Sequence, residues 1–332
     1  MSIRDVKATV TPALMEMEGV VGVGRSNNKL RVYVQNSPTL NGIPHEVAGY
    51  NVEVVHVGHI RALSVSDYDW PQTWVTSQFE AEPERLVAAY GRTDRFDPLV
   101  CGVSIAHKKV TAGTLGFAMN VGGKTYGVSN NHVLANASSV QVERAKIGDE
   151  ILQPGPADGG VLPSDIAGTL SGFVPIDEIN VNLLDLALFE PTRSLSPEIL
   201  GIGIPNGFTQ LKVGDKVRKS GRTSGVTYGT VQDIDATLSV DYGEYEAVFD
   251  HLVVTDGIAQ GGDSGSALIR QENLNIGGLL FAGSEYITCH MHINTVLNAF
   301  DPSTPPEEGR TSLSLGGLAL IPLGLGMVWA SR

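Results

Sequence analysis

The heptapeptide Gln260-Gly261-Gly262-Asp263-Ser264-Gly265-Ser266 is the stretch of sequence that decides the fold. Its glycines allow backbone conformations that are closed to other residues, so the turn can present the Ser264 hydroxyl. The same turn can aim two backbone N–H groups at one point, as an oxyanion hole requires. Glycine, serine and aspartate also dominate ordinary turns between strands. A reactive serine therefore needs a base and an orienting acid elsewhere in the chain.

Two other segments offer those groups. His132 follows a strand-like segment and begins an apolar turn, where histidines often have only a structural role. Asp185 is the single carboxylate within the apolar segment 181–189. A lone buried charge is costly, and a histidine N–H is a suitable partner for it. His132, Asp185 and Ser264 would then be base, orienting acid and nucleophile.

The composition favours a soluble β-rich protein. The chain has 332 residues, of which 42% are hydrophobic and 18% charged, with 39 glycines and 17 prolines. From about Val100 onward, strand-like segments recur every eight to twelve residues, as is typical of a barrel or sandwich. The formal net charge of −13 would repel a phosphate backbone, so we do not expect nucleic acid as a partner.

The two ends of the chain have different patterns. Apolar residues at helical spacing over 6–17, followed by short alternating strands, predict a small α/β domain over 1–62. An acidic linker is predicted over 63–95, and a second linker over 301–312. The tail 313–332 has an uncharged stretch over 313–330 that is either a membrane anchor or a segment that packs on the body or on an edge strand. Its glycines and proline make a poor helix, which favours packing.

The N-terminus and the cysteines bear on location and cofactors. The first residues lack the basic start and apolar run of a secretory signal, and there are only two cysteines, Cys101 and Cys289. We therefore expect a cytoplasmic protein, and the sequence leaves open whether the cysteines pair. Cys289, His290 and His292 lie close together but lack a partner cluster, so no metal and no other cofactor is expected.

Several motifs together resemble the chymotrypsin/trypsin family of serine proteases. The contexts of the three candidate residues carry the resemblance: Asn130-Asn131-His132-Val133, Asp185-Leu186-Ala187-Leu188 and Gly262-Asp263-Ser264-Gly265. The histidine context is closest to HtrA-type proteases, and the segment 219–231, with its Gly-Arg-Thr, is similar to α-lytic protease and streptogrisin. Short motifs over 102–105, 112–116, 153–155 and 158–160 are similar to bacterial trypsin-like proteins related to the plant narrow-leaf type.

This resemblance covers roughly residues 1–300 and implies the architecture. The fold would be mostly β, a two-barrel chymotrypsin-like domain over 96–300 preceded by the small α/β domain. His132 and Asp185 would belong to a first barrel over 96–192, and Ser264 to a second over 205–292. The segment 293–300 would be the terminal helix.

The resemblance also implies a serine endopeptidase. Ser264 would attack a peptide carbonyl of a polypeptide substrate, His132 would transfer the proton, and Asp185 would orient the ring. The N–H groups of Gly262 and Ser264 would form the oxyanion hole. Because α-lytic-type enzymes place an arginine in the Gly-Arg-Thr segment, an Asp263–Arg222 ion pair is predicted. The alternative function is a catalytically silent peptide-binding or scaffold protein with the same fold.

The resemblance further locates a substrate pocket. Trypsin has an aspartate six residues before the nucleophile, where this chain has Ile258, so a preference for basic residues is not expected. The strand 279–284 would form the other wall and pair with the substrate backbone. The predicted pocket residues are Ile258, Ala259, Phe281, Ala282 and Gly283, which suit a small or medium apolar side chain. The natural substrate and the oligomeric state are left open.

Overall fold

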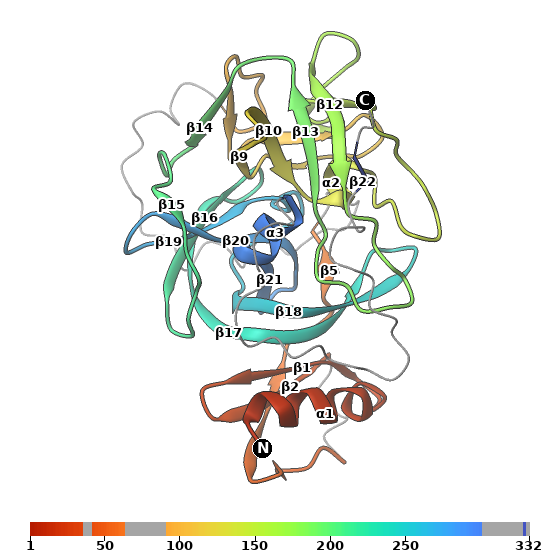
Figure 1. Cartoon of the computed structure of the whole chain (residues 1–332), viewed down its shortest axis with the longest axis vertical. Helices are drawn as coiled ribbons and strands as arrows, with labels where there is room; N and C mark the ends of the chain where they lie inside the picture. Colours follow the sequence, from red (N-terminus) through yellow and green to blue (C-terminus); the bar gives the residue numbers. More distant parts are fainter. Residues whose placement is uncertain (36–41, 64–90, 301–327, 330–332) are drawn as a thin grey trace.

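The protein is mostly β, with barrel-like sheets, as the sequence predicted. The computed structural model describes residues 1–35, 42–63, 91–300 and 328–329. Figure 1 shows a small N-terminal unit at one end of the molecule and two larger groups of strands beyond it.

The N-terminal unit is a helix packed on a small sheet. Helix α1 (Ile3–Met15) begins at a capping box, in which the Ser2 hydroxyl accepts from the Asp5 N–H and the Asp5 carboxylate accepts from the Ser2 N–H. Its apolar face covers a hydrophobic cluster formed with the strands beneath it. These strands are β1 (Val20–Ser26), β2 (Lys29–Val34), β4 (Tyr50–His56) and the short β3 (Glu46–Val47).

The second barrel is a closed ring of six strands. Its strands follow one another in the order β16 (Lys216–Gly221), β19 (Ala267–Arg270), β20 (Asn275–Gly283), β21 (Ile287–His292), β18 (Glu246–Asp256) and β17 (Gly225–Asp241). Pairing of β16 with β17 closes the ring. Strand β1 also pairs with β17, so the N-terminal unit and this barrel share one sheet.

Close packing fixes the junction between the two units. Gly22 on β1 lies opposite Leu238 on β17. A Cβ at Gly22 would lie 2.3 Å from the Leu238 side chain and 2.6 Å from the Thr237 carbonyl oxygen. Only glycine therefore allows this approach of the two strands.

The other large sheet carries the first half of the predicted protease domain. Its order is β8 (Gly113–Thr114), β7 (Ser104–His107), β11 (Glu150–Leu152), β12 (Ile166–Phe173), β13 (Ala187–Pro191), β10 (Lys124–Ser129) and β9 (Phe117–Val121). Strands β9 and β10 form an antiparallel hairpin within this sheet. Two further strands, β6 (Leu99–Cys101) and β14 (Leu195–Ile199), pair with each other in parallel.

The remaining elements connect or close this body. A short strand, β15 (Gly207–Phe208), pairs with β20, and helix α3 (Ile293–Phe300) matches the predicted terminal helix. One large hydrophobic cluster draws residues from both sheets. Cys101 and Cys289 are both buried and unpaired.

The apolar tail lies mainly outside the described residues. Its described part is a two-residue strand, β22 (Val328–Trp329), which pairs with β12. In the parts of the chain that the structure describes, no helix has the length and apolar character needed to cross a bilayer.

Candidate active site

The site begins with a buried histidine and carboxylate. The short helix α2 (Asn131–Leu134) holds His132 directly after β10, and Asp185 lies just before β13. His132 Nδ1 lies 2.5 Å from Asp185 Oδ2, and the His132 backbone N–H donates to Asp185 Oδ1 at 3.2 Å. Pairing of β10 with β13 brings the two elements together. The structure thus places these two predicted residues in direct contact.

A tyrosine completes the surroundings of that carboxylate. The hydroxyl of Tyr242, which lies at the turn between β17 and β18, donates to Asp185 Oδ2 at 2.7 Å. Burial raises the pKa of Tyr242 well above its ordinary value, and the Asp185 charge adds to this effect. Tyr242 therefore stays protonated and can act as a permanent donor to Asp185.

The serine loop has the backbone shape that its glycines predict. Gly262 and Gly265 both have a φ of +93°, in the left-handed region that favours glycine. At Gly265 a Cβ would also lie 2.1 Å from Ser129 Oγ, so no larger residue fits. This close packing holds the Ser264 loop against β10, the strand that leads into His132.

The serine hydroxyl makes no hydrogen bond to the histidine in this structure. Ser264 Oγ donates to the Phe281 carbonyl oxygen at 3.0 Å. His132 Nε2 is buried and has no hydrogen-bond partner among the described residues. Strand β8 links the two sides, because Thr114 N–H donates to the Ser264 carbonyl at 2.7 Å while Gly113 packs against Val133. Strand β8 therefore contacts both the serine loop and the helix that carries His132.

The predicted Asp263–Arg222 ion pair is wrong. Asp263 instead pairs with Lys219 of β16 at 2.8 Å, and both side chains are fully buried. Arg222 forms an ion pair with Asp158, to which its Nε donates at 2.8 Å. Lys219 lies on the inward face of β16 with Val217, while Arg222 follows the end of that strand. The side-chain direction along β16 therefore decides which cation reaches Asp263.

The Asp263 carboxylate remains charged despite its burial. Burial by itself would raise its pKa, but the Lys219 charge and the bonds from Ser224 outweigh that effect and leave the pKa below its usual value. The backbone N–H groups of Thr223, Ser224 and Gln260 also donate to this carboxylate. Asp263 thus ties the 223–224 turn to the start of the serine loop.

The predicted pocket residues do not all lie in one place. Ala259 packs with Leu280 and Leu63, whereas Ile258 belongs to a separate hydrophobic cluster. The Phe281 side chain points into the core, where its ring centroid lies 4.8 Å from that of Phe249.

The backbone of β20 faces the site. Phe281 contributes its carbonyl oxygen there, and Ala282 and Gly283 pair with β5 (Arg61–Ala62). Figure 1 shows β5 reaching from the N-terminal unit into the body of the molecule.

The residue after β5 reaches the serine loop itself. Leu63, which the sequence assigns to a linker, is buried. Its N–H donates to the Phe281 carbonyl at 3.1 Å, and its carbonyl oxygen accepts from the Gly262 N–H at 2.7 Å. Of the two predicted oxyanion donors, Gly262 therefore binds a carbonyl oxygen. The Ser264 N–H makes no backbone hydrogen bond within the described part of the chain.

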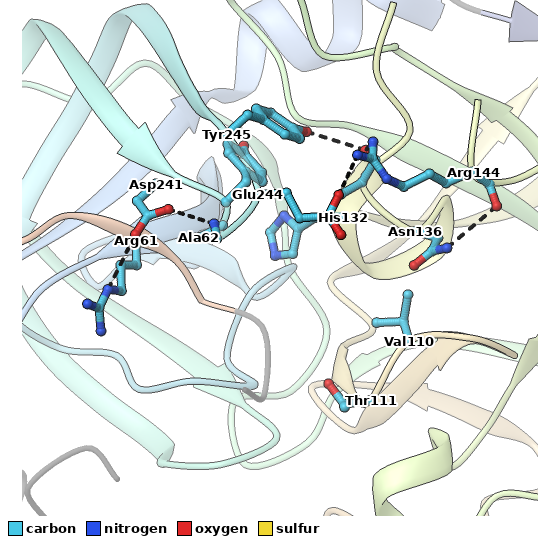
Figure 2. A pocket seen from close by; sticks show the side chains of 13 residues that line it. Arg61, Ala62, Val110, Thr111, His132, Asn136, Arg144, Asp241, Glu244 and Tyr245 are labelled. Carbon is cyan, nitrogen blue, oxygen red and sulfur yellow. Dashed lines mark hydrogen bonds and ion pairs between the residues drawn. The ribbon is translucent and has the colours of Figure 1, made fainter. Parts of the chain in front are cut away.

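A pocket of about 470 Å³ adjoins the histidine. Figure 2 shows Arg61 and Ala62 on one side of His132 and Arg144 on the other, all three at the wall of the pocket. The Arg144 guanidinium lies 5.6 Å from the centre of the Tyr245 ring and bonds to Glu244 at 2.7 Å. Residues of β5 and of the turn between β17 and β18 thus line the same pocket as His132.

Three residues of the site were not found from the sequence. Tyr242 and Leu63 carry no local motif, because only the fold brings them to the site. Lys219 did carry a signal, since it lies two residues after the apolar Val217 and would share a face with it in a strand.

Comparison with known proteins gives likenesses in structure alone. No family model and no curated protein matches the chain. One similar solved structure is described as a glutamic acid specific serine protease, with 22% identity, a TM-score of 0.43, and coverage of 61% of this chain and 97% of that one. Thermobifida fusca protease A and an α-lytic protease homolog are each 20% identical with a TM-score of 0.43, and each likeness covers 61% of this chain and 95% or 96% of the other.

The chain thus resembles serine proteases among solved structures, as its motifs predicted. The likeness to these structures is one of fold.

Proposed function

We propose that the protein is a serine endopeptidase with Ser264 as nucleophile, His132 as base and Asp185 as orienting acid. The observation that carries the proposal is a peptide carbonyl, that of Leu63, bound by the Gly262 N–H two residues before Ser264. A hydrogen-bond donor at that position is what an oxyanion hole requires. The buried His132–Asp185 pair adjoins the same cleft.

The proposed reaction hydrolyses a peptide bond of a polypeptide substrate in two stages. Ser264 Oγ attacks the carbonyl carbon while His132 Nε2 takes its proton and then gives it to the leaving amine. Water, deprotonated by the same His132, then attacks the resulting ester. The bond between the acyl carbon and Ser264 Oγ breaks, the acid is released, and His132 returns the proton to Oγ. Asp185 stabilises the imidazolium, and its bond to Nδ1 holds the tautomer that leaves Nε2 free to accept. The reaction needs no cofactor.

A fluorophosphonate probe tests the nucleophile. We expect covalent labelling of Ser264 that disappears in Ser264→Ala and falls strongly in His132→Ala, because both the hydroxyl and its base are needed. Since Leu63 lies beside the serine, labelling is measured on the intact chain and on Leu63→Glu. Peptide mapping identifies the modified residue. Absence of Ser264 labelling in both folded proteins would refute the proposal.

A second candidate function is a catalytically silent peptide-binding protein. The bond from Ser264 Oγ to Phe281, instead of to His132, favours it. In that case the cleft would still bind extended peptides along β20, but no variant would react with the probe or hydrolyse them.

A further inference from the structure

We infer that residues 61–63 of this chain occupy its own active-site cleft as a substrate would, with Leu63 as the residue before the cleavable bond. The segment inhibits the folded protein and reveals a preference for leucine-like side chains. The description of this segment as a substrate mimic and an inhibitor rests on the proposed function. The occupancy itself rests on backbone geometry.

The backbone of the segment is bound as an added strand. Ala62 lies opposite Ala282, and Arg61 opposite Gly283, in an antiparallel pairing of β5 with β20. Extended peptides are commonly recognised by such strand addition to a sheet. The pairing ends at Leu63, whose N–H and carbonyl groups bond to Phe281 and Gly262 at 3.1 Å and 2.7 Å. A strand partner on one side and an oxyanion donor on the carbonyl are the contacts that a substrate needs at that position.

The Leu63 side chain shows what the pocket selects. It is 1% exposed and packs with Ala259 and Leu280. A Cβ at Gly283 would lie 3.4 Å from Leu63 Cδ1, so the side chain lies close to the pocket wall. The pocket is therefore apolar and closely matched to leucine, which narrows the predicted preference for small or medium apolar residues.

A second strand holds the segment from its other side. β5 also pairs in parallel with β17, where the Asp241 N–H donates to the Ile60 carbonyl at 3.0 Å. The Asp241 carboxylate lies 3.0 Å from His59 Nε2 and 3.7 Å from Arg61 Nε. Ile60 is itself buried.

These contacts make the segment a competitor of any substrate. A segment tethered to the rest of the same chain competes at a high effective concentration. The Phe281 carbonyl that binds Leu63 also binds the Ser264 hydroxyl. Residues 61–63 therefore fill the substrate side of the cleft while the Ser264 hydroxyl bonds to Phe281 and not to His132.

The first test compares rates of fluorophosphonate labelling in the full chain. Leu63→Glu places a charge in the apolar pocket, so we expect it to free the cleft and to raise the labelling rate more than about tenfold. Leu63→Met keeps an apolar side chain of similar volume, so its labelling rate should rise much less than that of Leu63→Glu. His56→Glu adds the same charge at an exposed position before the segment and should also label like the wild type. Equal rates for the wild type and Leu63→Glu would overturn the inference.

The second test does not depend on catalysis. A fluorescent acetyl-His-Ile-Arg-Ala-Leu peptide, which copies residues 59–63, is titrated against the folded Leu63→Glu/Ser264→Ala protein. We expect saturable binding that is lost when the peptide ends in glutamate, and weaker binding to Ser264→Ala alone, in which the cleft is filled. Binding without any probe labelling would refute the proposed function but support the occupancy. No difference in peptide binding between the two proteins would refute the occupancy even if Ser264 reacts with the probe.

Discussion

Two buried carboxylates, Asp185 and Asp263, belong to the proposed active site, and their partners differ. Both side chains are fully buried. Asp185 bonds to the ring of His132 and to the Tyr242 hydroxyl. Asp263 has a lysine ammonium, Lys219, at 2.8 Å. One carboxylate is thus placed against a base that can change its charge, and the other against a fixed cation.

The difference gives the two carboxylates separate tasks. A histidine beside Asp185 can alternate between neutral and charged forms, so this pair suits proton transfer. The Lys219–Asp263 pair keeps both charges buried, and removal of one would leave the other without compensation. We therefore expect changes at Asp185 to reduce turnover with little effect on stability, and changes at Lys219 to do the reverse.

The largest expected effect is on turnover in Asp185→Asn. The amide keeps the shape of the side chain but favours the wrong tautomer of His132, which typically costs about 10⁴-fold in kcat. The rate is measured in the Leu63→Glu background with a peptide substrate that has Leu immediately before the cleavable bond. The melting temperature serves as the control for folding. A loss of only a few-fold would mean that Asp185 does not orient the base.

The next largest effect is on stability in Lys219→Met. Methionine fills much of the same volume but leaves Asp263 without its cation, which should lower the free energy of unfolding by about 3–5 kcal/mol. Urea denaturation measures this change. The double variant Lys219→Met/Asp263→Asn should recover part of the loss, because neither charge remains.

Arg222→Met is the matched control for that experiment. Arg222 bonds to Asp158 and keeps some contact with solvent, so we expect a smaller loss of about 1–2 kcal/mol. A larger loss for Arg222→Met than for Lys219→Met would contradict the assignment of Lys219 as the partner of Asp263.

A third buried carboxylate, Asp233, shows what happens without a bonded cation. Its partners are the Tyr33 hydroxyl at 2.8 Å and the Asp235 N–H at 2.9 Å. Burial raises its pKa to about 6, although its hydrogen bonds and the more distant charges of Lys7 and Arg31 act in the opposite direction. Between pH about 4 and about 6 the folded state therefore binds more protons at Asp233 than the unfolded state does.

The free energy of unfolding should consequently fall as the pH rises through this window. A shift of about two pKa units corresponds to roughly 3 kcal/mol, and the contribution should level off above pH about 6. Asp233→Asn lacks the titrating group, so its stability relative to the wild type should increase over the same window. Urea denaturation across that pH range measures the difference. A difference that does not change with pH would contradict a raised pKa for Asp233.

The sequence predicted features correctly where the local residue pattern and the energetic cost of burying a charge led to the same conclusion. The fold class followed from the spacing of strand-like segments and from the resemblance, the terminal helix over 293–300 followed from the resemblance, and the structure has both. The contact of His132 with Asp185 followed from the cost of a lone carboxylate in an apolar segment. A histidine is a suitable partner for such a carboxylate, and the chain has only eight histidines, so few candidates were left.

The sequence did not predict contacts that depend on the direction of a side chain along a strand or on residues far apart in the chain. Arg222 and Lys219 are three residues apart, and only the inward face of β16 distinguishes them as partners of Asp263. Leu63 looked like linker sequence because its pocket is built from β20 and residue 259, about two hundred positions later. Tyr242 reaches Asp185 only because the hairpin of β17 and β18 extends over the site.

The smallest expected effect concerns Tyr242, which we expect to act as a positioning residue. Tyr242→Phe removes one donor from Asp185 while the bond to His132 remains, so kcat should fall by about tenfold, as expected for the loss of roughly 1.4 kcal/mol of transition-state stabilisation. KM should stay unchanged, because the hydroxyl bonds to the carboxylate and not to substrate. Kinetics in the Leu63→Glu background separate the two constants.

Tyr245→Phe is the control, because Tyr245 stacks on Tyr242 with ring centroids 5.2 Å apart but donates its hydroxyl to the Ala137 carbonyl. Tyr245→Phe should change kcat by no more than about twofold, because the Tyr245 hydroxyl does not bond to Asp185. If both variants raised KM and left kcat unchanged, Tyr242 would shape the pocket wall beside His132, and the orientation of Asp185 would depend on His132 alone.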